Sequence, residues 1–400
     1  MPLLLTTAAC TSATVPKPVT APVSLAWHQI GLPSDPRGRD VVRALTACGS
    51  RWYVAGGLLG SDGATAPALW SSTDGRTFTP MRIKTVGAYG PEDILSTVAC
   101  HGATVVAVGA KSGGAHGNLR TSTWVGSGDG PLTEVAAGFE QYGGEAQIGV
   151  GTVAGGGAGF LLVGARVDAS GGAGAAVWHS PDGTAFTLVD SDPALESDVR
   201  GTTEVDAATV GVAGFLAVGA ITPPHSPLAA RDPIAWRSSD GLHWTRISLP
   251  SSAPDNLLQQ VTLQPDGSAL AAGADGATFA VWRSDASWHD WRMVGSFGHT
   301  TSASGSLPEA VSLVTTPGTG VAAYAVVSDG VRYRLYTDTG TTADDGTHRG
   351  GWIEATLPVT VSATPIPSGP RIVVAARTDQ GLILGVDDGS HASLWVANLP

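Results

Sequence analysis

Charged side chains are scarce in this sequence: Asp, Glu, Lys and Arg together make up 14% of its 400 residues. Only three residues are lysines, no run of basic residues occurs, and the formal net charge is -12. A surface that binds DNA or RNA needs clustered Lys and Arg to neutralise phosphates. Nucleic acid is therefore excluded as a partner.

The sequence also lacks a long segment with helical periodicity, and no run after its first residues is long and apolar enough to cross a membrane. A Gly-rich phosphate loop, a Gly-x-Ser-x-Gly nucleophile elbow and a Cys-x-x-Cys pair are missing as well. Glycine is abundant instead, with 54 residues, and proline contributes 26. This composition predicts many short strands joined by tight turns.

The N-terminal segment MPLLLTTAACTSATVPKPVTAPV joins a short apolar run to small residues and a cysteine. Residues 1–10 resemble the end of a bacterial lipoprotein signal, in which Cys10 becomes the lipidated first residue of the mature chain. The resemblance implies an extracytoplasmic protein held at the outer face of the cell membrane by that lipid alone. Residues 11–24 would then form a flexible tether. The alternative is a disordered tail with an incidental cysteine.

A tryptophan on a strand-like run, followed by an Asp-Gly turn and a second aromatic residue, recurs along the chain. It appears as ALWSSTDGRTF at 68–78, AVWHSPDGTAF at 176–186 and AWRSSDGLHW at 235–244. Together with more degenerate copies, the repeat gives seven units. Their equivalent aromatic residues are Trp70, Trp124, Trp178, Trp236, Trp282, Tyr336 and Trp395.

Each unit has room for four strands. Apolar runs that end in glycine, such as VVAVGA at 105–110 and FLLVGA at 160–165, predict central strands buried on both faces. Another strand-like stretch precedes each run, and a fourth follows the Asp-Gly turn. Four-stranded antiparallel units repeated radially are typical of β-propeller blades. The sequence therefore predicts an all-β fold in which residues 25–400 form a single seven-bladed β-propeller of four-stranded antiparallel blades.

The recurring turn has a physical explanation. Glycine supports the positive φ of a tight hairpin, the aspartate carboxylate accepts local backbone N–H groups, and the tryptophan fills the wedge between blades. We expect these structural roles for Trp70, Asp74, Gly75, Trp178, Asp182, Gly183, Trp236, Asp240 and Gly241.

The STDG at 72–75 and the SPDG at 180–183 resemble, in shortened form, the Asp-box of exported sialidase-like (BNR-repeat) propellers. The resemblance implies a fold far more than an activity, because in those families the box is a structural turn away from the active site. No catalytic residue of those families has a counterpart in this sequence.

The two ends of the chain complement each other. The seventh unit ends after its third strand, whereas the segment AWHQIGLP at 26–33 is similar to the fourth strands HWTRISLP at 243–250 and GWIEATLP at 351–358. We expect the N-terminal strand to complete the last blade, which closes the ring and removes exposed sheet edges.

The long, dissimilar connections share one end of a propeller, so that face is the candidate site. Acidic residues stand near the entry of the innermost strand in six units and would converge at the mouth of the central channel. They are Asp40, Glu92, Asp93, Glu145, Glu204, Asp255 and Glu309. Such a ring could hold a hard cation, attract a cationic group or raise the pKa of one member. Alternatively, each carboxylate bonds to local backbone; no other cofactor is expected.

Cys48 and Cys100 occupy equivalent positions at the ends of consecutive inner strands. A disulfide between them and two buried free thiols both fit the repeat.

We interpret the chain as a monomeric binding or assembly module of the cell envelope, whose loop-rich face meets a protein, peptide or glycan ligand. One alternative is an extracellular glycoside hydrolase or lyase that uses carboxylates at the channel mouth. A structural subunit without a pocket is a third reading.

The lipid anchor is directly testable. In a bacterial host the protein should partition with membranes and carry acyl mass on Cys10, and Cys10→Ala should move it to the soluble fraction. Fractionation and mass spectrometry measure both. A soluble wild type with an unmodified cysteine contradicts the anchor.

Overall fold

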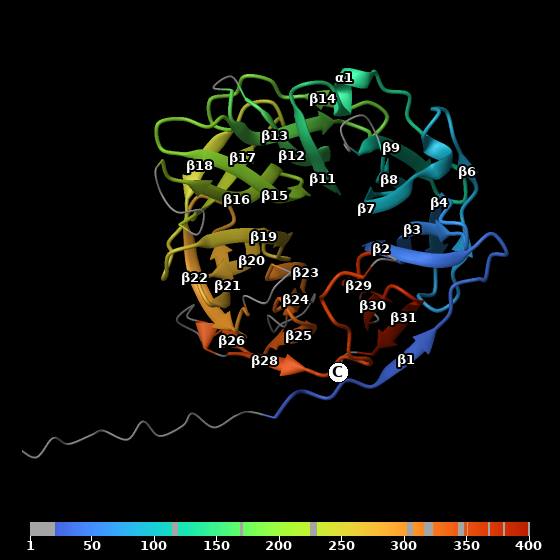
Figure 1. The fold of residues 1–400 in the computed structure, drawn as a ribbon. Coiled ribbons are helices and arrows are strands. Elements are labelled where there is room, and N and C mark those ends of the chain that lie inside the picture. The colour runs from blue at the N-terminus through green and yellow to red at the C-terminus, as the bar shows by residue number, and fades with distance from the viewer. Residues whose placement is uncertain are drawn as a thin grey trace, which may run out of the picture.

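The computed structural model describes residues 21–113, 119–168, 171–224, 230–301, 307–315, 323–342, 348–349, 351–366, 369–378 and 381–398. Seven antiparallel sheets stand around a central axis (Figure 1). Within the described ranges only α1 (Phe139–Tyr142) and the 3-10 turn η1 (Gly90–Glu92) are helical. The expected seven-bladed all-β propeller is confirmed.

Each blade pairs consecutive strands outward from an innermost strand, and the inner strands contact one another around the axis. Blade 1 contains β2 (Arg39–Cys48), β3 (Arg51–Leu59), β4 (Thr65–Ser72) and β5 (Thr79–Pro80). Blade 2 contains β7 (Ile94–His101), β8 (Thr104–Lys111), β9 (Arg120–Ser127) and β10 (Leu132–Glu134). Blade 3 contains β11 (Gln147–Gly156), β12 (Gly159–Val167), β13 (Ala173–Ser180) and β14 (Thr187–Leu188).

Blades 4 to 6 repeat this order. Blade 4 contains β15 (Thr202–Gly211), β16 (Gly214–Thr222), β17 (Asp232–Ser238) and β18 (Thr245–Ser248). Blade 5 contains β19 (Asn256–Leu263), β20 (Ala269–Asp275), β21 (Thr278–Ser284) and β22 (Trp291–Phe297). Blade 6 contains β23 (Glu309–Thr315), β24 (Ala323–Ser328), β25 (Tyr333–Asp338) and β28 (Trp352–Ala355).

Three short strands depart from the repeat. β6 (Ile83–Lys84) lies in the connection from blade 1 to blade 2 and pairs in parallel with β10, so blade 2 has a fifth, outermost strand. β26 (Thr341–Thr342) and β27 (His348–Arg349) form a separate two-stranded sheet within blade 6's last connection.

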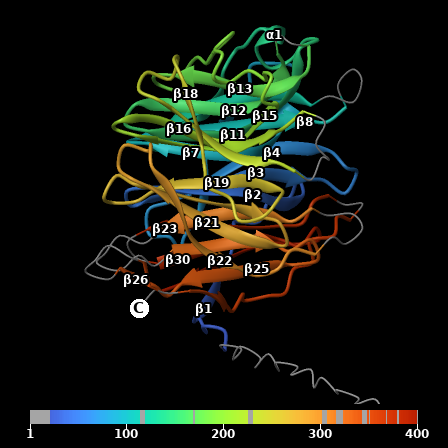
Figure 2. The same cartoon turned by 90° about the vertical axis from the view of Figure 1, so that its left-hand side faces the viewer.

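The last blade is completed from the other end of the chain, as expected. β29 (Ile372–Thr378), β30 (Gly381–Asp387) and β31 (Ala392–Ala397) come from the C-terminal part, and β1 (Trp27–Ile30) adds the outer strand. β1 runs antiparallel to β31, with Trp27 opposite Ala397 and Ile30 opposite Leu394. Figure 2 shows β1 beside the last blades at the edge of the ring.

The apolar core consists of seven layers, one between each pair of neighbouring blades. The second strand of a blade is buried on both faces because its alternate residues point to opposite neighbours. In β12, Leu161 and Val163 pack toward blade 4, whereas Phe160 and Leu162 pack toward blade 2. The repeated tryptophan of the third strand fills the layer toward the preceding blade.

The indole N–H of several repeated tryptophans fastens the connection that leads into the same blade. Trp178 donates to the Gln141 carbonyl at 3.1 Å, Trp236 to Ala194 at 2.7 Å and Trp282 to Pro250 at 2.7 Å. Each buried indole therefore satisfies its polar atom while it holds a loop in place.

In blades 1 to 5 the glycine that ends the apolar run lies beside a bulge in the inner strand. One extra residue is inserted opposite the second strand in blades 1, 2, 4, 5 and 6, namely Arg43, Ser96, Asp206, Gln259 and Val311, and β11 of blade 3 has two register shifts. The bulge brings the inner backbone close: a Cβ added at Gly219 would lie 2.0 Å from the Glu204 carbonyl oxygen. Only glycine fits there.

The Asp-Gly turns have the expected hydrogen bonds. The Asp74 carboxylate accepts the N–H of Thr77 at 2.7 Å and of Arg76 at 2.8 Å, and these bonds hold its pKa well below the ordinary value. The carboxylates of Asp182 and Asp240 bind N–H groups of their own turns in the same way. Gly75, Gly183 and Gly241 have φ values of 65°, 81° and 76°, which side chains rarely tolerate.

A disulfide joins Cys48 at the end of β2 to Cys100 in β7, with a Cα–Cα distance of 6.0 Å. It links the inner strands of blades 1 and 2. Cys10 lies outside the described residues. Val23, which falls in the segment expected to be a tether, already exchanges backbone hydrogen bonds with Glu354 and Thr356 of blade 6, both at 2.8 Å.

Closure of the ring depends on β1. Deleting residues 1–21 should leave a monomer with unchanged melting, because Val23 and all of β1 remain. Deleting residues 1–33 should expose the edge of β31 and remove the Trp27 contacts with blade 6, causing aggregation or loss of cooperative unfolding. Thermal unfolding and size-exclusion chromatography compare the two deletions. Equal melting of both would contradict closure by β1.

Candidate functional site

A cavity of about 340 Å³ opens among the long connections over blade 2. Three separate segments line it: residues 86–89 between β6 and η1, residues 119–122 at the start of β9, and residues 134–143 from β10 to α1. Figures 1 and 2 both place α1 at the rim of the ring, so the cavity lies away from the channel axis. Equivalent places over blades 3 and 6 hold smaller cavities of about 210 and 180 Å³.

Large apolar side chains are exposed around this cavity. Val86, Tyr89, Leu119 and Phe139 are 56%, 50%, 52% and 62% exposed. They come from all three lining segments. Grouped exposed apolar side chains are typical of surfaces that contact another molecule.

Arg120 lies between two of these side chains. Its guanidinium stands 5.6 Å from the centre of the Tyr89 ring and 5.3 Å from that of Phe139. Cation–π contacts of this kind hold the guanidinium plane in place. Its Nε is buried and has no hydrogen-bond partner in the structure. The site therefore presents an oriented cation without a protein anion.

Glu134 forms part of another wall of the cavity. Its Oε2 accepts the backbone N–H groups of Val86 at 2.6 Å and Gly87 at 2.8 Å. Glu134 is only 8% exposed, and these two bonds hold its carboxylate in place. Glu134 thus also orders the loop that carries Tyr89.

Asp93 and Ser122 lie behind this wall. The Ser122 hydroxyl donates to Asp93 Oδ2 and accepts the indole N–H of Trp124 at 2.8 Å. The pKa of Asp93 is raised to about 7, mainly by burial and to a smaller extent by the negative charge of Glu134, while the bond from Ser122 opposes the rise. Asp93 has no exposed surface, so it supports the wall of the cavity without meeting a ligand.

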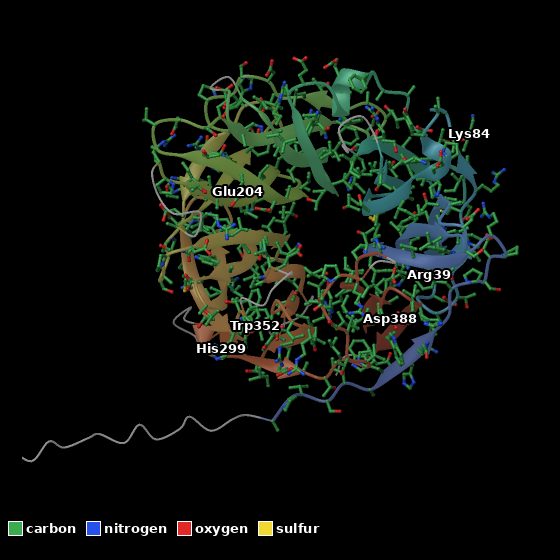
Figure 3. The ribbon with its side chains drawn as sticks, viewed as in Figure 1. Arg39, Lys84, Glu204, His299, Trp352 and Asp388 are labelled. Carbon is green, nitrogen blue, oxygen red and sulfur yellow. A yellow bond between two sulfur atoms is a disulfide. The ribbon has the colours of Figure 1, made fainter. Side chains whose placement is uncertain are left out.

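The predicted acidic residues all stand at or next to the entry of an inner strand, but they differ in environment. Glu92 pairs with Lys111. Glu204 and Asp255 share Arg231, at 3.4 and 2.7 Å. Glu145 is exposed, and Asp93 is buried beside blade 2. Figure 3 shows Glu204 and Arg39 on opposite sides of the ring. Among the described residues, no three His, Cys, Asp or Glu side chains are grouped as metal ligands.

Asp40 and Glu309, near the entries of their inner strands, have no ion pair with an arginine among the described residues. Desolvation raises the pKa of Asp40, and the negative charge of Asp35 adds to the effect. Glu309 has an accessible side chain, and desolvation raises its pKa as well.

Sequence reasoning missed two carboxylates that lie close to the inner strands, Asp206 and Asp387. Asp206, the bulge residue of β15, has a buried Oδ2 without a partner. Burial raises its pKa to about 7, the charges of Glu204 and Glu309 add to the rise, and Arg231 opposes it. Asp387 is fully buried between Arg39 and Arg43, at 3.2 and 2.8 Å. Asp206 is placed by a bulge in β15. Because a bulge is defined by the pairing of two strands, the sequence alone could not identify this residue.

The sequence predicted a site on the face of the long connections, but it did not identify the cavity over blade 2 or its aromatic residues. Its only sequence signal is large apolar residues within Gly-rich connections, VGAYGPED at 86–93 and AAGFEQYGG at 136–144.

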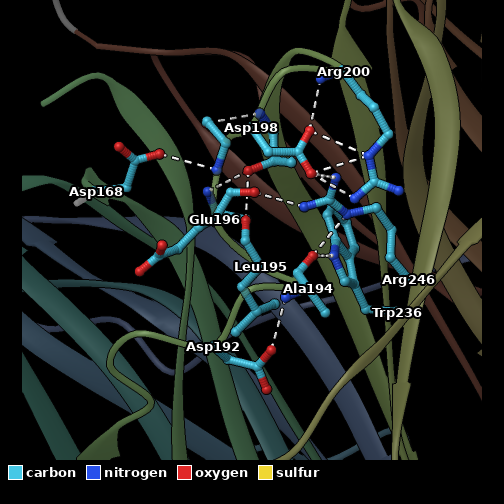
Figure 4. A network of polar contacts seen from close by, with 12 residues as sticks. Asp168, Asp192, Ala194, Leu195, Glu196, Asp198, Arg200, Trp236 and Arg246 are labelled. Carbon is cyan, nitrogen blue, oxygen red and sulfur yellow. Dashed lines mark hydrogen bonds and ion pairs between the residues drawn. The ribbon is translucent and has the colours of Figure 1, made fainter. Parts of the chain in front are cut away.

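The acidic segment between β14 and β15 is a fastened loop (Figure 4). Arg246 donates from Nε to the Ala194 carbonyl at 2.7 Å, from Nη2 to that of Glu196 at 2.6 Å, and from Nη1 to Asp198 at 3.3 Å. Asp192 accepts the N–H of Trp244 at 2.9 Å. These carboxylates are used in the fold.

No family model matches the chain, and no curated protein matches it. Among solved structures, a protein from Lactobacillus plantarum is 14% identical over 88% of this chain and 97% of its own, with a TM-score of 0.45. An α-L-arabinofuranosidase from Fusarium graminearum is 13% identical over 80% and 97%, with a TM-score of 0.43. Fructan 1-exohydrolase IIa from Cichorium intybus is 10% identical over 62% and 54%, with a TM-score of 0.36. Similarities this low carry no argument about activity. None of the described helices has the length and apolar composition of a membrane span.

Replacing Asp206 with asparagine should stabilise the ring at high pH. Because the folded pKa of about 7 lies above the ordinary 3.8, the folded state retains a proton that the unfolded chain loses between these values. Stability therefore falls as pH rises through this window, and the full cost of the buried charge is present above it. We expect Asp206→Asn to add about 1–3 kcal/mol to the unfolding free energy at pH 8 and little at pH 4. Urea unfolding across pH measures both proteins.

Asp182→Asn is the matched control with the opposite sign. Bonds from Thr184 lower the pKa of Asp182, so its contribution to stability is present at neutral pH and is lost as pH falls through the folded pKa. An effect of Asp206→Asn that is independent of pH would show that this carboxyl does not titrate in the window.

Proposed function

We propose that this propeller is a binding or assembly module of the cell envelope that presents its loop-rich face to a protein, peptide or glycan ligand. The observation that carries the proposal is the gathering of four exposed apolar side chains around the blade 2 cavity. Three loops from one rigid scaffold converge there, which is how propellers and other rigid folds build recognition sites.

The charges of the channel mouth favour binding over catalysis. A hydrolase that uses two carboxylates needs one protonated and one ionised group with access to substrate. Glu204 and Asp255 are both paired with Arg231, and the perturbed Asp206 keeps its Oδ2 buried. Asp206 and Glu309 nevertheless make a glycoside hydrolase or lyase the second candidate, because their raised pKa values suit a general acid.

An exported location supports the same role. The disulfide between Cys48 and Cys100 suits an oxidising compartment. The lipoprotein-like residues 1–10 suit attachment at the outer face of the membrane. We propose that the ring acts there as a monomer, without a metal or other cofactor.

Removing the apolar rim should abolish recognition without unfolding the ring. The variant Val86→Ser, Leu119→Ser, Phe139→Ser should lose the peptide or glycan array signals of the wild type by at least about tenfold, since each side chain is more than half exposed in the free protein. A matched control carries Val199→Ser, Val212→Ser and Leu307→Ser, at side chains 93%, 95% and 86% exposed elsewhere. The control should bind as the wild type does.

Equal signals from the two triple variants would contradict a site over blade 2. Turnover of a polysaccharide by the wild type, lost in Glu309→Gln, would instead favour the hydrolase.

A further inference from the structure

Arg120, in the cavity over blade 2, differs from the arginines that lie near the inner strands. Arg39, Arg43 and Arg231 all pair with carboxylates of the protein. No carboxylate among the described residues pairs with Arg120; its guanidinium lies over the rings of Tyr89 and Phe139, and its Nε is buried without an acceptor. A guanidinium has five N–H donors in one plane and matches a carboxylate through two parallel hydrogen bonds. The buried Nε cannot reach a ligand, but Nη1 and Nη2 have no acceptor among the described residues, so these terminal N–H groups are free to bind an anionic acceptor from outside the chain.

Glu134 supplies the opposite charge in the same cavity. Both of its hydrogen bonds go to Oε2, and Oε1 makes none in the structure. Although both residues are described and line the cavity, Arg120 and Glu134 do not pair with each other. A cation and a carboxylate held apart in one cavity suit a ligand with an anionic group on one side and an N–H donor on the other.

Apolar side chains form the outer part of the cavity. Val86, Leu119 and Phe139 form an exposed rim, and the volume of about 340 Å³ fits one large amino-acid residue with its backbone. A sugar ring needs many hydroxyl partners, whereas the Ser122 and Tyr142 hydroxyls of the lining already have partners within the protein. A phosphate or a second anionic group would be repelled by Glu134. The overall charge of -12 also disfavours anionic polymers, but a single carboxylate beside Arg120 feels mainly that close cation.

We propose that the blade 2 cavity binds an amino-acid residue with a free α-carboxylate, an adjacent N–H group and an apolar side chain. Two sources share this chemistry: the C-terminal residue of a peptide or protein, and a free apolar amino acid. Arg120 binds the carboxylate, Glu134 Oε1 accepts the N–H, and the rim contacts the side chain. The inference rests on the proposed binding function and names its ligand class.

Titration calorimetry of the wild-type chain with three small probes tests the assignment. N-acetyl-L-phenylalanine mimics a peptide C-terminus and should bind with a Kd of about 10 μM to 1 mM. N-acetyl-L-phenylalanine amide lacks the carboxylate and should bind about 10- to 100-fold more weakly. L-phenylalanine separates the two sources: a free amino acid is the ligand if it binds more tightly than the acetylated probe, and a peptide C-terminus if it binds less tightly.

Variants test the two polar contacts. Arg120→Gln should weaken N-acetyl-L-phenylalanine by the same factor as loss of the carboxylate, and Arg120→Lys should restore part of the affinity. Glu134→Gln should weaken L-phenylalanine more than the acetylated probe, because the ammonium is attracted by a charge that the amide N–H feels less. Arg76→Gln, at an exposed arginine of the blade 1 Asp-Gly turn, is the control and should bind like the wild type.

The comparison of acid and amide probes uses only the wild type, so it stands even if a variant fails to fold. Equal affinity for the two probes, or no saturable binding of either, overturns the carboxylate assignment. Array signals that depend on the apolar rim would survive that result, and then the site binds a ligand of another class. Loss of the rim dependence as well would remove the proposed function itself.

Discussion

Every blade of this protein relies on its two neighbours for a core. The seven apolar layers lie between blades, and a central strand such as β12 sends alternate residues into two different layers. A single blade therefore has no interior of its own, and an open row of blades would leave two faces uncovered. This constraint explains why the chain closes with β1 on β31 and why the repeated tryptophan recurs in almost every blade.

Ion pairs also join neighbouring blades of the closed ring. Asp387 at the end of β30 is buried, and it is neutralised by Arg39 and Arg43 from the inner strand of blade 1. Arg231 likewise joins Glu204 of blade 4 to Asp255 at the entry of blade 5. Removing one partner of a buried pair leaves a charge without compensation and costs more than the pair contributes. The scarce arginines of an acidic chain thus hold neighbouring blades in register.

The packing of the blades separates the scaffold from the candidate site. Inner strands, bulges and Asp-Gly turns are fixed by packing, and the connection before blade 4 is fastened by Arg246. Over blade 2, where β6 adds a fifth strand, Tyr89 and Phe139 are exposed and both contact the guanidinium of Arg120. The packing of the blades constrains the long connections least, and the candidate site lies among them.

The sequence by itself determined the fold, because the signals are local and repeated: a tryptophan, a Ser-x-Asp-Gly turn and an apolar run before a glycine. It also predicted the partner strand for the last blade, since the segment at 26–33 shares the pattern of other fourth strands. These features depend on period and turn chemistry, which neighbouring residues fix.

Only the tertiary structure decided the site. Glu92 and Asp93 are adjacent in sequence, yet Glu92 pairs with Lys111 while Asp93 is buried against Ser122. Asp206 became perturbed through a bulge that strand register alone defines. Tyr89, Arg120 and Phe139 come from three separate segments, the connection before η1, the start of β9 and α1, and their contacts depend on distances between segments far apart in the chain.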